Sequence, residues 1–267
     1  MFPIRLKWLA ASCLVLLVCL GMTACQTVPI TGRSQLLLLS EADEMQMGIQ
    51  SYQEVVKKSK LSTDPAANDL VKRVGTRIAA ATGRTDFPWE FVVIEDRQAN
   101  AFALPGGKVA VYTGILPITK DEAGLAAVLG HEVAHAVARH GAERMSQGLL
   151  VQVGLAGTMA ALSKRDPQTL QTVGALLGAG AAVGLMLPWS RSQESEADHL
   201  GLIYMAKAGY DPRAARDLWI RMAEASKGHD RPPEFLSTHP SESARIKQIE
   251  AWIPEASQYY RPVPSTR

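Results

Sequence analysis

The sequence predicts a mainly α-helical fold with one small β-sheet, of the α+β class. Apolar residues recur with a helical period along much of the chain, and some of these stretches begin at capping residues such as Ser40 and Asp64. β-Rich sequence occurs at residues 89–116. With 267 residues, of which 47% are hydrophobic and 20% charged, the chain is long enough to form a sizeable core.

The N-terminus has the pattern of an export signal. Arg5 and Lys7 precede an almost uncharged apolar run at 8–22. This run of about fifteen residues is shorter than the ~20 that span a bilayer, which favours a cleaved signal peptide at 1–24. Its ending, M-T-A-C, resembles the lipobox of bacterial lipoproteins, so we expect Cys25 to be lipidated. The alternative is an ordinary signal peptide in which Cys25 has no role.

Cysteine usage and charge add further limits. The other two cysteines lie within the predicted signal, so a mature chain that begins at Cys25 has no internal disulfide. Gln26 stands where retention in the inner membrane usually shows Asp, and the bacterial sorting rule then implies the periplasmic face of the outer membrane. The 28 basic and 26 acidic residues are interspersed, which argues against a nucleic-acid partner.

Capping and turn residues divide the first half of the chain. Residues 25–39 are expected to be a lipid-anchored leader, and the domain is expected to occupy 40–255. Its first predicted elements are helices at 40–58 and 65–83, a strand at 89–96, and a hairpin at 100–116 that turns at Pro105-Gly106-Gly107. Thr119 and Glu122 then form a capping-box pattern that starts a helix containing HEVAH, residues 131–135.

Two apolar stretches rich in Gly and Ala follow, at 148–162 and 172–187. Each is too short to span a bilayer, so we expect two close-packed buried helices, with a membrane hairpin at 148–187 as the alternative. Helices at 190–208, 212–226 and 241–252 complete the domain, and residues 256–267 form a C-terminal tail.

HEVAH predicts half of a metal site. His131 and His135 are one helical turn apart, about 40° round the axis and about 6 Å along it, so both imidazoles can reach one ion. Zinc accepts such a pair through neutral nitrogens, and Glu132 is placed to take a proton from a metal-activated water. The alternative is that the H-E-x-x-H pattern occurs by chance on an amphipathic helix. Burying two histidines and a glutamate without partners would, however, cost several kcal/mol.

The other ligands must come from elsewhere in the chain. His140 points about 140° away from His135 on a continuous helix, and we expect it to support the helix end or a ligand. Glu194, Glu196 and Asp198 stand at the start of a later helix, where the first and last of them share a face. One carboxylate can bind the metal while another holds an imidazole. An acidic first turn that complements the helix dipole is the alternative.

These motifs together resemble one enzyme family. HEVAH, E-S-E-A-D-H-L-G, NAFALPGG and TGRSQLLLLS are similar to segments of the HtpX/Oma-type zinc metallopeptidases, over about residues 31–252. The chain looks most like the LoiP/BepA-like outer-membrane lipoprotein branch, without its helical repeats. The resemblance implies a zincin-like domain with an HExxH active-site helix and an edge strand for substrate. It implies one zinc per chain, held by His131, His135 and Glu194, with Asp198 beside them.

The same resemblance covers a T-H-P segment, which here is Thr238-His239-Pro240 before a possible helix N-cap at Ser241. It implies that His239 is a displaceable fourth ligand that gates the zinc. A loop histidine without a role is the alternative. An arginine follows the same segment in the family, and Arg245 occupies that place.

The expected activity is hydrolysis of peptide bonds by a zinc metalloendopeptidase. Glu132 would act as general base, and Arg245 or His239 would donate a hydrogen bond to the oxygen of the tetrahedral intermediate. Substrate could add as an extended strand along the 100–104 segment. The expected substrate-binding residues are Asn100, Ala101, Phe102 and Ala103.

The resemblance also implies a role in quality control. Its expected partners are misfolded or misassembled periplasmic and outer-membrane proteins, together with the membrane that holds the lipid at Cys25. One alternative is a lipid-anchored assembly factor or chaperone with little proteolysis, against which the presence of Glu132 argues. The other is an integral membrane peptidase that uses 148–187 as a hairpin.

Overall fold

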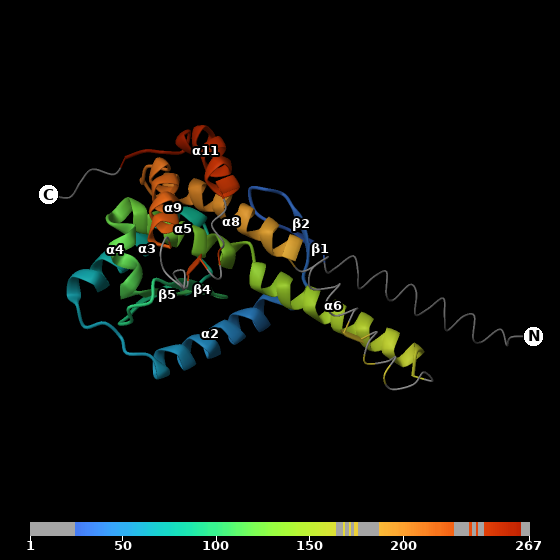
Figure 1. The fold of residues 1–267 in the computed structure, drawn as a ribbon. Coiled ribbons are helices and arrows are strands. Elements are labelled where there is room, and N and C mark those ends of the chain that lie inside the picture. Colours follow the sequence, from blue (N-terminus) through green and yellow to red (C-terminus); the bar gives the residue numbers. More distant parts are fainter. Residues whose placement is uncertain are drawn as a thin grey trace, which may run out of the picture.

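Helix α5, Glu122–Val137, lies at the centre of the fold (Figure 1). Every residue from Gly124 to Val137 is buried, because helices and a sheet pack on α5 from several sides. The computed structural model describes residues 25–163, 187–226 and 243–262, with isolated residues between these ranges. The predicted signal at 1–24 lies outside them. The mainly helical α+β prediction is confirmed. HEVAH lies within a helix, but in its last two turns and not well inside it, because α5 ends at Val137.

The two helices before the sheet begin where their capping residues predict. Helix α2, Glu41–Lys58, starts at Ser40, whose hydroxyl accepts the N–H of Asp43. Helix α3, Pro65–Thr82, starts at Asp64 and ends at Gly83, which has a left-handed φ of 74°. Short polar side chains therefore cap the N-termini of both helices. The left-handed conformation that ends α3 is one that only glycine adopts without strain.

A three-stranded sheet covers one side of α5. Its strands are β3 (Glu90–Ile94), β4 (Ala101–Leu104) and β5 (Lys108–Tyr112), in the order β3-β5-β4. β3 is parallel to β5, and β4 is antiparallel to it, which leaves β4 at an edge beside α5. The hairpin and its turn are confirmed. The second strand ends at Tyr112, earlier than predicted, because η1 (Thr113–Ile115) and α4 (Leu116–Thr119) follow.

The predicted cap of α5 is two residues too early. Thr119 belongs to α4, where its hydroxyl donates to the carbonyl of Leu116. Asp121 is the N-cap, because its side chain accepts the N–H of Gly124 at 2.8 Å. Lys120 lies between them with a positive φ of 72°, which breaks the helical path and separates the two helices.

Helix α8, Leu187–Lys207, crosses α5 in backbone contact. A Cβ atom on Gly130 would lie 2.8 Å from the carbonyl oxygen of Gly201, and one on Gly201 would lie 2.9 Å from the nitrogen of His131. The crossing therefore requires glycine on both helices. Gly209 ends α8 with a φ of 88°, as its position predicts.

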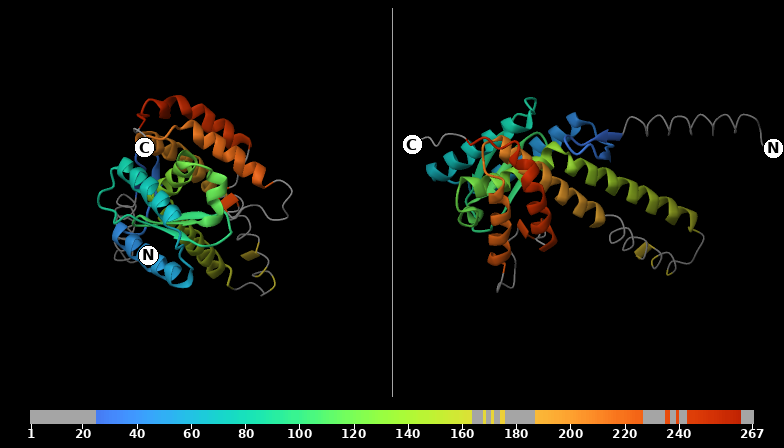
Figure 2. Two further views of the ribbon diagram at one scale, coloured as in Figure 1. Left: turned by 90° about the vertical axis from the view of Figure 1, so that its left-hand side faces the viewer. Right: turned by 90° about the horizontal axis from the view of Figure 1, so that it is seen from above.

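Helix α9 (Arg213–Ala225) packs against α5, and α11 (Ser243–Ser257) packs against α8 and α9 (Figures 1 and 2). The predicted helix at 212–226 is confirmed to within a residue at each end. The last helix continues five residues beyond its predicted end at 252, and Ala256 is buried, with 1% of its surface exposed. The start of the predicted C-terminal tail thus packs on the core.

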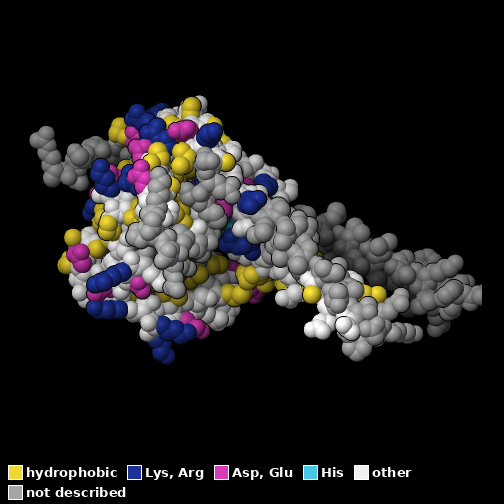
Figure 3. Space-filling model, in the orientation of Figure 1, with side chains coloured by type: hydrophobic (Ala, Val, Ile, Leu, Met, Phe, Trp, Pro, Cys, Tyr) yellow, Lys and Arg dark blue, Asp and Glu magenta, His cyan; other side chains and the backbone are white. Residues whose placement is uncertain are grey.

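Helix α6, His140–Ala161, projects away from the body (Figures 1 and 2). The prediction of a buried helix at 148–162 is wrong, because Leu149, Leu150 and Val153 are 45%, 47% and 70% exposed. Most of the second apolar stretch, 172–187, lies outside the described residues. Among the described helices, none has the length and apolar character needed to cross a bilayer. Basic and acidic side chains are interspersed on the visible face of the body (Figure 3).

The predicted leader is folded against the body. Strands β1 (Cys25–Thr27) and β2 (Ser34–Leu36) pair antiparallel, and β2 contacts α6. Val28 and Leu37 are buried, with 2% and 4% of their surfaces exposed. Residues 25–39 therefore contain a hairpin that is held on the body by two buried apolar side chains, while Ile30 and Leu38 stay exposed.

Gly130→Ala is expected to lower the free energy of unfolding by about 1–3 kcal/mol, because its methyl group would force α5 and α8 apart. Thermal or urea unfolding measures the change. Zinc affinity should fall as well, since the next residue is His131. Gly157→Ala is the matched control: it lies in α6 with open space around its Cβ, and it should stabilise the chain by about 0.5–1 kcal/mol. Equal stability of the two variants would contradict this account of the crossing.

Candidate metal centre and active site

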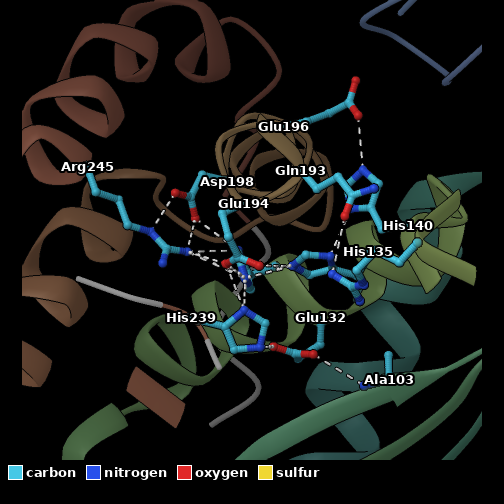
Figure 4. Close-up of polar contacts among 12 residues, drawn as sticks. Ala103, Glu132, His135, His140, Gln193, Glu194, Glu196, Asp198, His239 and Arg245 are labelled. Atoms are coloured by element: carbon cyan, nitrogen blue, oxygen red, sulfur yellow. Dashed lines mark hydrogen bonds and ion pairs between the residues drawn. The ribbon is translucent and has the colours of Figure 1, made fainter. Parts of the chain in front are cut away.

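Two histidines of α5 and one glutamate of α8 converge at the helix crossing (Figure 4). The Nε2 atoms of His131 and His135 lie 3.1 Å apart. Glu194 Oε2 lies 3.3 Å from the first of these nitrogens, and its Oε1 lies 3.2 Å from the second. The predicted ligand triad is thus assembled in space, although its members are far apart in the sequence.

His239 supplies a fourth atom to the cluster. Its Nδ1 lies 3.0 Å from His131 Nε2 and 2.8 Å from Glu194 Oε2. One ligand atom from each of the four residues lies within 4.8 Å of the others. Zinc with bonds of about 2.0–2.1 Å has tetrahedral ligand separations of about 3.3 Å, so the spacing suits a single zinc ion. The neighbours Thr238, Pro240 and Ser241 lie outside the described residues.

Asp198 fixes the tautomer of His131. Its Oδ1 lies 2.9 Å from His131 Nδ1, and both of its oxygens also accept hydrogen bonds of 2.7 Å from Arg245. Burial raises the pKa of Asp198, but Arg245 and His131 outweigh burial and lower it, so this carboxylate is ionised and only accepts. In the neutral imidazole that can bind a metal, His131 Nδ1 therefore carries the proton, and Nε2 presents a lone pair to the cluster.

A break in the helical path brings His140 back towards His135. Helix α5 ends at Val137, and Arg139 has a positive φ of 59°, which costs about 1–2 kcal/mol for a residue other than glycine. The buried ion pair of Arg139 with Glu44 holds this turn. The expectation that His140 points about 140° away assumed a continuous helix and is wrong in its geometry.

His140 fixes the tautomer of His135. Glu196 Oε2 lies 3.0 Å from His140 Nε2, and the pKa of this glutamate is lowered to about 2, because hydrogen bonds from His140, Arg33 and Thr31 outweigh burial. An ionised Glu196 accepts the Nε2 proton of a neutral His140, whose Nδ1 then accepts from His135 Nδ1 at 2.8 Å. His135 Nε2 is left with a lone pair that faces the lone pair of His131.

The charges of the cluster call for a cation. Burial raises the pKa of Glu194, but the three histidines that surround its carboxylate outweigh burial and hold the pKa well below its usual range. Burial lowers the pKa of His131, yet hydrogen bonds to Asp198 and Glu194 raise it to about 9, so in the metal-free site Nε2 carries a proton that a bound metal would displace. For His135, burial prevails and lowers the pKa well below its ordinary value. Two facing lone pairs beside ionised carboxylates fit a divalent metal, which both neutralises the charge and uses the lone pairs.

Glu132 lies between this cluster and the sheet. Its Oε2 accepts the backbone N–H of Ala103 in β4 at 3.2 Å (Figure 4). Its Oε1 is buried, makes no hydrogen bond within the described part of the chain, and lies 3.4 Å from His239 Nε2. Burial raises the pKa of this carboxyl, which moves it towards the range of a general base that works near neutral pH.

The predicted substrate strand is an edge strand. Tyr112 N–H donates to the carbonyl of Asn100, so by the alternation of an antiparallel ladder the polar groups of Phe102 also face β5. The backbone N–H and C=O groups of Ala101 and Ala103 face away from β5, on the side of β4 that has no neighbouring strand in the sheet. The side chains of Asn100 and Glu132 accept their two N–H groups.

Sequence reasoning missed the part played by Glu196. It is two residues from Glu194, so it leaves the opposite side of α8 and lies away from the ligand cluster, as expected (Figure 4). Its partner His140 reaches it only because of the turn at Arg139. No motif or periodicity marks that turn, since the segment A-V-A-R-H contains neither glycine nor proline.

A family model, peptidase family M48, matches residues 65–253, which includes all four cluster residues. The chain belongs to this family. It is therefore a metallopeptidase of a zinc-dependent kind, and the His/Glu cluster on α5 and α8 is the site that fits one zinc ion.

The relatives in this family come from mitochondria and from bacteria. The chain is 42% identical to mitochondrial metalloendopeptidase OMA1 of Schizosaccharomyces pombe, over 88% of this chain and 68% of that protein. It is 36% identical to the Bos taurus OMA1 metalloendopeptidase, with coverages of 88% and 47%. The Beta-barrel assembly-enhancing protease of Escherichia coli (strain K12) is 30% identical, with coverages of 82% and 46%.

These comparisons confirm the predicted family but do not support its outer-membrane lipoprotein branch in particular. The mitochondrial proteins match at higher identity than the bacterial protease, so the M48 assignment stands without the outer-membrane lipoprotein branch. The chain spans less than half the length of the Bos taurus and Escherichia coli relatives. What those proteins do as wholes therefore enters only as a proposal.

Proposed function

We propose that this M48 metallopeptidase cleaves unfolded or misassembled polypeptides of the bacterial cell envelope, as a quality-control endopeptidase. The observation that carries the proposal is the position of Glu132. Its carboxylate bridges the His/Glu cluster and the N–H of Ala103 on the substrate strand. A general base is thus held where a scissile bond would meet the metal.

The side chains divide the chemistry between them. We propose His131, His135 and Glu194 as the zinc ligands, and zinc, when bound, supplies an activated water and polarises the peptide carbonyl. Glu132 takes up the proton of the attacking water through Oε1, which makes no hydrogen bond to a described residue. It then returns that proton to the departing amine.

The substrate is proposed to bind β4 as an added strand. Ala101 and Ala103 direct their backbone carbonyls away from β5, while Asn100 and Glu132 hold their N–H groups. Pairing through the main chain requires no particular side chain of the substrate. It does require an extended segment. Folded proteins rarely expose one, and this selects misfolded or unassembled chains.

We revise the role proposed for Arg245. It packs over Trp219, 3.5 Å from the ring centroid, and donates two hydrogen bonds to Asp198. It acts by holding Asp198, and through it the ring of His131. His239, the other donor considered for the oxygen of the tetrahedral intermediate, is proposed below as a gate that leaves the cluster before substrate enters.

Glu132→Gln is expected to keep about one zinc per chain, because Glu132 is not among the four cluster residues. Cleavage of unfolded casein should fall by at least about a hundredfold, since proton transfer by a positioned side chain contributes about 10²–10⁴. Metal analysis and a casein assay measure the two properties. Glu54→Gln, at an exposed glutamate, is the control. Cleavage by Glu132→Gln at the wild-type rate would exclude Glu132 as the base.

We propose that His239 gates the zinc. With His239 in place the four cluster residues fill a tetrahedral coordination, whereas catalytic zinc sites keep one position open. The arrangement in Figure 4 is then a closed state that His239 must leave before water and substrate enter. Its side chain is 12% exposed, and its backbone N–H donates to the carbonyl of Phe235.

His239→Ala is expected to raise casein cleavage at low substrate concentration and to weaken zinc binding by less than loss of His131 would. The physical reason is that the variant opens one coordination position and leaves three ligands. His239→Gln, which can still reach the cluster but binds zinc poorly, is the companion variant. If His239→Ala cleaved casein and bound zinc as the wild type does, the proposed gating role of His239 would be wrong.

We propose attachment to the periplasmic face of the outer membrane through a lipid on Cys25. The support is the M-T-A-C sequence and the start of β1 at this residue, which places the attachment point beside the folded body. A chaperone that retains only the fold is disfavoured by the intact Glu132 site. The exposed Leu149, Leu150 and Val153 of α6 leave a direct membrane contact as the second candidate.

Cys25→Ser in the full chain is expected to move the protein from the membrane fraction to the fraction released by carbonate, because no acyl chain would then be attached. Fractionation of the variant and the wild type, with detection of the lipidated peptide, measures this. A variant that resists carbonate extraction would favour the integral membrane alternative, in which 148–187 holds the chain.

A further inference from the structure

The N-terminal hairpin touches the residues that orient a metal ligand. Thr31 Oγ1 donates to Glu196 Oε1 at 2.5 Å, and Arg33 Nε donates to Glu196 Oε2 at 2.8 Å. Glu196 is the carboxylate that fixes His140, and His140 fixes His135. A continuous hydrogen-bonded path therefore runs from the segment just after Cys25 to the imidazole of His135.

Arg33 neutralises two buried carboxylates at once. Besides Glu196, it donates to both oxygens of Glu143, at 2.7 and 2.8 Å, in a forked pair. Hydrogen bonds with these glutamates raise the pKa of Arg33, so it stays charged. Glu143 and Glu196 are only 4% and 7% exposed. Without a cation between them, the two carboxylates would repel each other and move apart, and His140 would lose its acceptor.

The same hairpin region also supports the turn that aims His140. Gln26 Oε1 accepts from Arg139 Nη1 at 2.6 Å, and the carbonyl of Leu39 accepts from Arg139 Nη2 at 3.2 Å. Arg139 is the residue with the left-handed backbone. Residues 26–39 thus contact both features on which the direction of His140 depends, namely its carboxylate and the turn before it.

We propose that Thr31 and Arg33 are positioning residues of the metal centre, acting on His135 through Glu196 and His140. The two ligand histidines are then oriented by different means: His131 directly by Asp198 of α8, and His135 by a path that ends in the N-terminal hairpin. The family match at 65–253 does not reach this hairpin. Undocking the hairpin would loosen one zinc ligand and leave the other held.

The test measures zinc affinity of the full chain by competition with a chelator, for Arg33→Met, Thr31→Val and Glu196→Gln. Arg33→Met and Glu196→Gln are expected to weaken zinc binding by about 10–100-fold, the usual effect of losing a partner behind a ligand. Thr31→Val should act in the same direction by a smaller factor. Melting of the zinc-free proteins reports whether each variant folds, and if Arg33→Met does not fold, Thr31→Val decides.

Ser146→Ala is the matched control. Ser146 Oγ accepts the N–H of Leu38, so this variant removes one bond between the same segment and α6 without touching Glu196. Its zinc affinity should stay within about twofold of the wild type. Equal losses of affinity in Ser146→Ala and Thr31→Val would overturn the proposal, because hairpin docking alone would then explain both. So would unchanged affinity in Thr31→Val and Arg33→Met.

A double variant tests the path itself. If Arg33 acts through Glu196, Arg33→Met should weaken zinc binding little further in a Glu196→Gln background, whereas independent effects would multiply. Multiplying effects would exclude the path. The inference rests on the zinc centre of the proposed function, but zinc affinity is measured without substrate. A wild-type chain that binds zinc and leaves casein intact would overturn the proposed function and not this inference.

Discussion

The backbone contact of α5 with α8 is the constraint on which the site depends. Glycines at positions 130 and 201 let the two helices touch, and the ligands of the metal cluster stand within a turn or two of that contact. HEVAH supplies two imidazoles from one helix, and the crossing presents Glu194 to them. A larger residue at either glycine would separate donor atoms that must lie about 3.3 Å apart to share a zinc ion.

The buried charges are arranged so that each ligand has a fixed partner behind it. Asp198 and Arg245 stand behind His131, while His140 and Glu196 stand behind His135. Ionised carboxylates at the outer ends of both paths leave lone pairs at the inner ends. This orders the site before a metal arrives and limits the loss of conformational entropy on binding. His239 and Glu132 complete the arrangement from outside the two paths.

A structural hairpin and a catalytic fold are coupled in this chain by polar contacts. The segment after Cys25 had the character of a leader in the sequence, since it is polar and then apolar with no helical period. In the fold its apolar residues Val28 and Leu37 enter the core, while Thr31 and Arg33 reach α8. A lipid anchor at Cys25 would therefore hold the enzyme close to the membrane, with little slack between them.

Local signals in the sequence determined much of the fold and half of the site. Capping residues and glycines fixed the ends of α2, α3 and α8, because the orphan N–H groups and the positive φ angles at those points admit few side chains. The HEVAH spacing predicted that His131 and His135 share one face of a helix, since one turn of helix sets their directions, and the structure places their rings side by side. The prediction that Thr119 caps α5 was wrong because Lys120 has a positive φ that separates α4 from α5, and no residue type in the sequence indicates this turn.

The rest was decided by tertiary structure. By spacing alone, without the family resemblance, Glu194, Glu196 and Asp198 were alternatives. The crossing places the first in the cluster, the last against His131 and the middle one against His140. The exposure of α6 could not be read from its apolar composition, because burial depends on what packs against a helix. The turn at Arg139 depends on an ion pair with Glu44, 95 positions earlier. Contacts of that range leave no local pattern, because their energy comes from burial and charge pairing that exist only once the chain has folded.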